Sequence, residues 1–183
     1  MHTQPITDVK ELQKFKEVVL GLMDGPWDFQ VDRVAAKGWW AIPVESSAHF
    51  SKEEAQRLAI AIRHLGCSEC LAVATEPLAQ HPEGFKLSPT PEALLAFSQE
   101  CGLFNFMLFE PGLHFAILCT TEDYFVVAGP KGFAEEALGL SVEVAREQFE
   151  RFASHWPEGK NWGALRNMLK AVSKRYASLP PRS

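Results

Sequence analysis

Three residues near the middle of the chain have the types and spacing of a thiol or metal site. Cys67 and Cys70 form a CxxC pair, and His64 lies three residues before it. This spacing occurs in redox dithiols and in half of a zinc site. A redox dithiol sits where a helix begins, because the helix dipole there lowers the thiol pKa, whereas here a predicted helix ends near Leu65.

A zinc ion bound by His64, Cys67 and Cys70 would need a fourth ligand from far along the chain: His49, His81, His114 or Cys101. The sequence contains no second CxxC and no HxxxH to supply it. We therefore interpret the two cysteines as a structural pair and expect no metal or other cofactor. Metal binding by these three residues is the weaker alternative, and redox chemistry is the weakest.

Two further histidines, His81 and His114, have side chains suited to general base chemistry or to binding. The chain has neither a GxSxG elbow nor a papain-like cysteine context, so neither histidine has a recognisable nucleophile. His114 alternates with Ala116 and Leu118, which predicts one face of a strand. A lone histidine there is more often a core or rim residue than a catalyst.

The segment 127–133 carries a weaker signal for an anion site. It predicts a strand that passes through Gly129 into a helix carrying Lys131, and such a helix start presents backbone N–H groups. The Walker pattern GxxxxGK[ST] is absent, so we favour a plain turn. No carboxylate pair is placed by the sequence on the wall of a pocket.

The segment 76–89 is the connection that we expect to carry a site. It has three prolines, Gly84 and no periodicity over fourteen residues, which exceeds the usual connection in a compact domain. Long loops on a rigid scaffold often hold binding groups, although a proline-stiffened connection is the simpler interpretation. The candidate binding residues are His81, Glu83, Phe85 and His114.

The elements that must position these residues can be predicted from periodicity and capping residues. Ser51 and Glu54 form a capping box, Thr90 with Pro91 opens a helix, and Gly139 closes one. The expected helices cover about 7–24, 51–65, 90–100, 131–138, a stripe from 141 to Trp156, and 162–176. A strand is expected at 70–75, and the runs 103–109, 114–120 and 124–128 predict an antiparallel meander covered on both faces.

The segment 27–44 is ambiguous. Its alternation predicts a hairpin, but Trp27, Val31 and Val34 also fit one face of a helix. With the hairpin included, the pattern predicts one α+β domain over residues 1–183. Its sheet should be mixed, largely antiparallel and of about five or six strands, with helices packed on it.

The charge of the chain is unevenly distributed. The net charge is −5, yet from Lys160 onward there are six basic residues and no acidic one. A basic tail can bind nucleic acid, but the apolar stripe of the last helix favours docking on an acidic body. Trp162 and Tyr176 fall on that stripe rather than on an exposed face, so nucleic acid is a disfavoured partner.

Composition excludes several classes of protein. No stretch is long and apolar enough for a membrane span, residues 1–15 lack a secretory leader pattern, and four cysteines are too few for a disulfide scaffold. These features predict a cytoplasmic protein without a membrane partner. They set no oligomeric state.

The absence of an assembled catalytic motif favours a binding protein over an enzyme. The acidic composition and the many aromatic residues predict a small protein-binding module, of the kind formed by inhibitors or immunity-type proteins. The alternative is an enzyme or small-ligand binder with its site under residues 76–89.

Overall fold

The structure, a computed structural model, describes residues 3–46, 49–155 and 162–179. The strands are β1 Thr3–Pro5, β2 Trp40–Glu45, β3 Cys70–Ala74, β4 Gly84–Leu87, β5 Phe106–Phe109, β6 Ala116–Cys119 and β7 Tyr124–Gly129. The helices are α1 Val9–Leu22, α2 Val31–Ala36, α3 Lys52–His64, α4 Pro91–Cys101, α5 Lys131–Leu138, α6 Val142–His155 and α7 Gly163–Tyr176.

The strands form one sheet in the order β1-β4-β3-β5-β6-β7-β2. The predicted meander β5-β6-β7 is confirmed, and so is the single α+β domain. The sheet differs from the expectation in having seven strands, every pair of which is antiparallel. The two unexpected strands, β1 and β4, are three and four residues long, too short for a period to show in the sequence.

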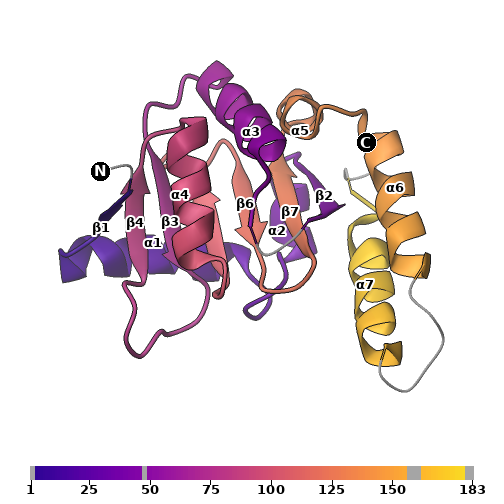
Figure 1. Ribbon diagram of the computed structural model, residues 1–183, viewed down its shortest axis with the longest axis horizontal. Helices are drawn as coiled ribbons and strands as arrows, with labels where there is room; N and C mark the ends of the chain where they lie inside the picture. Colours follow the sequence, from indigo (N-terminus) through magenta and orange to yellow (C-terminus); the bar gives the residue numbers. More distant parts are fainter. Residues whose placement is uncertain (1–2, 47–48, 156–161, 180–183) are drawn as a thin grey trace.

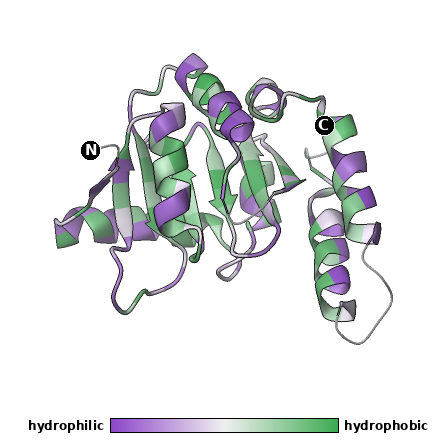
Figure 2. Ribbon diagram, viewed as in Figure 1, coloured by the Kyte–Doolittle hydropathy of each residue, from purple (hydrophilic) through white to green (hydrophobic). Residues whose placement is uncertain are grey.

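Both faces of the sheet are covered, which explains why its strands are apolar at successive positions. Along β3, Cys70 and Ala72 belong to one core, while Leu71 and Val73 belong to the other. Helices α3, α4 and α5 cover the first face, and α1, α2 and α7 cover the second (Figure 1). Figure 2 shows the result, since the strands are mostly hydrophobic while the helices alternate hydrophilic and hydrophobic residues.

The residues predicted to begin and end helices form the expected local contacts. Ser51 Oγ accepts the Glu54 N–H, and the Glu54 carboxylate accepts the Ser51 N–H, so the capping box at α3 is confirmed. Thr90 caps α4. Gly139 ends α5 with a φ of +67°, a left-handed conformation that glycine adopts without strain.

The predicted hairpin over 27–44 is wrong. Only β2 forms there, and it is preceded by the short helix α2, whose Val34 is fully buried. The helical face weighed as the alternative for this segment is therefore realised from Val31 onward. Strand β2 pairs with β7 instead, about 80–90 residues away along the chain.

The last helix is part of the domain, as its apolar stripe predicts. Leu169, Val172 and Tyr176 are buried against the second face, and Arg175 forms ion pairs with acidic residues of the 24–28 turn. Trp162 differs from the expectation, because it is 46% exposed. Trp156, Lys160 and Arg182 lie outside the described residues.

Both edges of the sheet are protected from pairing with other chains. Strand β1 is short, and β2 carries Pro43 and is covered by α6. Among the described residues, no helix combines the length and the apolar character needed to cross a bilayer.

Candidate functional site

Residues 75–83 connect β3 to β4, and Glu83 anchors them to the domain. Its Oε2 atom lies 2.5 Å from Lys16 Nζ on α1, and its Oε1 atom accepts the Leu78 N–H at 3.0 Å. These contacts lower the pKa of Glu83, the Lys16 hydrogen bond most strongly and the Leu78 N–H next. The candidate binding residue Glu83 thus has a partner on each carboxylate oxygen.

Phe85 lies in β4 and its side chain is fully buried, so the expectation of an unstructured segment from 76 to 89 is wrong. The pairing of β4 with β1 and β3 supplies the strand's stability, and none of it is visible locally in the sequence. His81 lies nearer the surface. Its ring is half-buried against Phe104 and Phe85, with centroid distances of 4.7 and 5.8 Å.

His114 lies at the opposite end of the sheet from His81. Ala74 pairs with Phe106, so residues 75–83 adjoin the start of β5, whereas His114 follows the end of that strand. Four strand residues separate the two ends by roughly 13 Å. His114 is exposed in the turn before β6, not within the strand, and the structure does not bring it together with the other candidates.

Glu110 organises the turn that carries His114. Its carboxylate accepts the N–H groups of Gly112 at 2.6 Å and His114 at 2.9 Å, and its Oε1 atom lies 2.6 Å from His114 Nδ1. Burial alone would raise the pKa of Glu110, but these N–H groups and the His114 ring outweigh it and lower the pKa. A Cβ at position 112 would come within 2.8 Å of Glu110 Oε1, so a larger residue there would displace this carboxylate.

The residues of the CxxC group have separate surroundings. His64 Nδ1 lies 2.6 Å from Glu136 Oε1 on α5, Cys70 is fully buried at the start of β3, and Cys67 is half-buried. Burial raises the pKa of both thiols, that of Cys70 to about 12. In the part of the chain that the structure describes, no three His, Cys, Asp or Glu side chains are placed to hold a metal ion.

Four connections that are distant in sequence meet at the end of the sheet where His81 lies. We call this surface, residues 24–28, 75–83, 102–105 and 120–123, the acidic end; its loops form the lower edge of the sheet in Figure 1. It has no lysine or arginine and six acidic residues: Asp24, Asp28, Glu76, Glu83, Glu122 and Asp123.

Asn105 joins three of these connections. Its Nδ2 atom donates to Glu76 Oε1 at 3.0 Å, its Oδ1 atom accepts the Thr121 N–H at 2.9 Å, and its carbonyl accepts the Thr75 N–H at 3.0 Å. Thr75 Oγ1 in turn donates to the Pro26 carbonyl at 2.8 Å. A buried amide with both ends satisfied holds one arrangement. Asn105 is not a residue that the sequence patterns single out, because its only signal is a polar side chain inside the apolar run 103–109.

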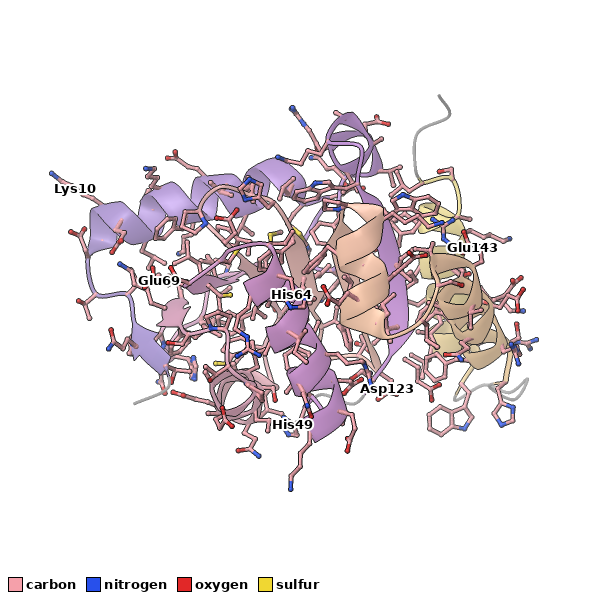
Figure 3. All side chains as sticks on the ribbon, turned by 90° about the horizontal axis from the view of Figure 1, so that it is seen from above. Lys10, His49, His64, Glu69, Asp123 and Glu143 are labelled. Carbon is pink, nitrogen blue, oxygen red and sulfur yellow. The ribbon has the colours of Figure 1, made fainter. Side chains whose placement is uncertain are left out.

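Half of the acidic side chains at the acidic end are engaged in ion pairs: Glu83 with Lys16, and Asp24 and Asp28 with Arg175. Glu76, Glu122 and Asp123 form no ion pair with the residues that the structure describes. These three carboxylates leave a negative electrostatic potential on this surface. Figure 3 shows Asp123 on the same side of the molecule as His49.

Large apolar side chains accompany these charges. Leu20, Trp27 and Leu103 are each more than half exposed. Leu20 lines a depression of about 130 Å³ together with Thr75, Glu76 and Pro77. Trp27 follows the hydrogen-bonded Pro26 in the chain, and Leu103 comes two residues before Asn105. Exposed apolar residues gathered with acidic ones are typical of contact surfaces.

An aromatic cavity lies next to the acidic end. Phe97, Phe104, Phe106, Cys101 and Cys119 are among its walls, and its volume of about 20 Å³ has room for roughly one water molecule. The rings of Phe97 and Phe106 meet edge to face at 5.5 Å. The cavity is too small for a drug-sized ligand or a cofactor.

Comparison of the chain with models of protein families, with curated proteins and with solved structures found no match.

Proposed function

We propose that this protein is a binding module that recognises a basic, partly apolar segment of another protein through the acidic end. The observation that carries the proposal is the gathering on one surface of three exposed large apolar side chains and three carboxylates that form no ion pair with the described residues. An inhibitor or immunity-type protein, which blocks its partner by covering it, is the form of module that we favour.

Two physical arguments support this proposal. Apolar and aromatic anchors supply most of the free energy of a protein interface, and Trp27 and Leu103 are of this kind. Complementary charge raises the association rate and discriminates against acidic partners. The hydrogen bonds of Asn105 reduce the entropy that the surface would lose on binding, because its connections are already held in place.

The alternative, an enzyme or small-ligand site under residues 76–89, has less support. The depression that Thr75, Glu76 and Pro77 line has a volume of about 130 Å³, whereas sites for drug-sized ligands usually measure about 300 Å³ or more. The aromatic cavity at the same end of the sheet holds only about 20 Å³. Its thiols are poor nucleophiles, since burial raises the pKa of Cys101 to about 12 and raises that of Cys119 as well.

We further propose that the protein acts in the cytoplasm. The four cysteines are free, and Cys70 and Cys101 are buried as thiols in the core. A reducing compartment keeps such residues in this state.

The proposal can be tested with a displayed library of random peptides selected on the immobilised protein. We expect the enriched peptides to combine Lys or Arg with an apolar anchor. Their affinity should fall as salt is added, because exposed charges are screened at high ionic strength. Leu103→Glu should lower the affinity for these peptides by about tenfold or more, equivalent to about 1.4 kcal/mol.

Val9→Glu is the matched control, because Val9 is 79% exposed and Leu103 is 78% exposed, but Val9 lies at the start of α1 away from the acidic end. Both variants should have the melting temperature of the parent protein, since neither side chain is buried. Peptides that bind Leu103→Glu and Val9→Glu equally well would contradict the proposal, as would selection of acidic peptides.

A further inference from the structure

A larger cavity lies apart from the anchors of the acidic end, between helices α3, α5 and α6 and the end of β2. Its volume is about 210 Å³, and Phe125, Leu138 and Phe149 form an apolar part of its wall. In Figure 3, α3, α5 and α6 follow one another from left to right. A depression along α6 shares Glu45 and Gln148 with this cavity, so the cavity opens to solvent there.

One wall of the cavity is formed by Arg57, an arginine that has no partner among the described residues. No ion pair or hydrogen bond joins Arg57 to another described residue; its Nε atom is buried and unsatisfied, as is that of Arg146 on α6. A terminal nitrogen of Arg146, however, donates to the carbonyls of Tyr176 and Leu179, and its guanidinium lies over the Trp40 ring. The Arg57 guanidinium has no such acceptor, and it is a fork of donors suited to a carboxylate.

Carboxylates line the same cavity without neutralising Arg57. Glu54 lies three residues before Arg57 on α3, a spacing that places both side chains on one helix face. Its Oε2 atom is held by the Ser51 N–H, and no ion pair to Arg57 forms. Glu45 adds a second carboxylate at the open side. A ligand with only a negative or only a positive charge would meet a like charge in the cavity.

From this geometry we infer that the cavity binds a free α-amino acid with an apolar side chain. The α-carboxylate pairs with the Arg57 guanidinium, the α-ammonium group lies toward the carboxylates of Glu45 and Glu54, and the side chain packs on Phe125 and Phe149. A cavity of roughly 150 Å³ holds a benzene ring, so about 210 Å³ suits a phenylalanine or leucine side chain with its head group. This inference does not rest on the proposed function.

Isothermal titration of the full chain with L-phenylalanine and L-leucine tests the inference. We expect saturable binding of both. Phenylacetate lacks the ammonium group and phenethylamine lacks the carboxylate, so each should bind at least about tenfold more weakly than phenylalanine, a difference of about 1.4 kcal/mol.

Two variants locate the site. Arg57→Gln should lower the affinity for phenylalanine by about tenfold or more. Arg63→Gln is the control, because Arg63 lies at the exposed end of the same helix, and it should leave the affinity unchanged. Ala145→Leu places a larger side chain in the cavity wall and should abolish binding while its melting curve shows that it is folded. Leu103→Glu should bind phenylalanine as the parent protein does, which separates this inference from the proposed function.

Three results would overturn the inference: no saturable binding of either amino acid, phenylacetate or phenethylamine binding as tightly as phenylalanine, or unchanged affinity in Arg57→Gln. If Arg57→Gln does not fold, Ala145→Leu decides, since undiminished binding in that variant would place the amino acid elsewhere.

Discussion

At the scale of single residues, Phe85 and His81 lie close together in the sequence but differ in burial. Phe85 is fully buried, and its ring contacts those of Phe97 and Phe106 at centroid distances of 6.3 and 6.0 Å. His81, four residues earlier, covers the edge of the same aromatic group from the surface. A substitution that changes both residues at once would therefore mix loss of stability with loss of any contact made by the loop.

We predict that Phe85→Ala lowers the free energy of unfolding by about 3–5 kcal/mol, because it leaves a cavity among packed rings. His81→Ala should lower it by less than about 1 kcal/mol, since the ring is partly exposed. Urea denaturation followed by tryptophan fluorescence measures both values. Equal losses in the two variants would mean that the loop is as much a part of the core as β4.

At the scale of elements, α7 is docked by polar contacts at one end and apolar contacts along its length. The Tyr176 hydroxyl accepts the buried Phe29 N–H at 2.9 Å and donates to Asp28 Oδ1 at 3.4 Å. Burial raises the pKa of Asp28 despite the nearby Arg175. The helix therefore supports the 24–28 turn, which belongs to the acidic end.

We predict that Tyr176→Phe costs about 1–3 kcal/mol of stability, because the Phe29 N–H then stays buried without an acceptor. Lys174→Ala, on the exposed side of the same helix, serves as control and should change stability by less than about 0.5 kcal/mol. Chemical denaturation gives both numbers. If Tyr176→Phe matches the control, then α7 is held by its apolar stripe alone.

At the scale of the whole molecule, the sheet separates two ends with different chemistry. The acidic end carries charge and exposed apolar side chains, whereas the opposite end holds Cys67, Cys70 and the Glu110 turn. Buried thiols occur in two different elements: Cys70 in β3 and Cys101 in α4. They report on whether the domain opens as one unit.

We predict that Cys70 and Cys101 are alkylated only when the whole domain unfolds, and at one common rate. With a pKa of about 12 for Cys70 and Cys101, roughly one thiol in ten thousand is ionised at pH 8 even where reagent reaches it. Mass spectrometry after timed exposure to iodoacetamide resolves each residue. Early labelling of one buried cysteine would reveal a region that opens independently.

The sequence by itself determined most of the helices and the central meander, because the signals for these elements are local. The Ser51 and Glu54 capping box and the glycine at 139 act within one helical turn. The apolar runs that became β5, β6 and β7 are joined by tight turns, so their pairing followed from their order along the chain.

Only the tertiary structure decided the short strands and both candidate sites. Strands β1 and β4 exist because they pair with each other, and β4 also with β3, which no local pattern encodes. Asn105 and Arg57 became notable through neighbours from distant segments: Glu76 and Thr121 for the first, the walls of α5 and α6 for the second. Such sites depend on which loops and helices end side by side, and this follows from packing the two faces of the sheet rather than from spacing in the sequence.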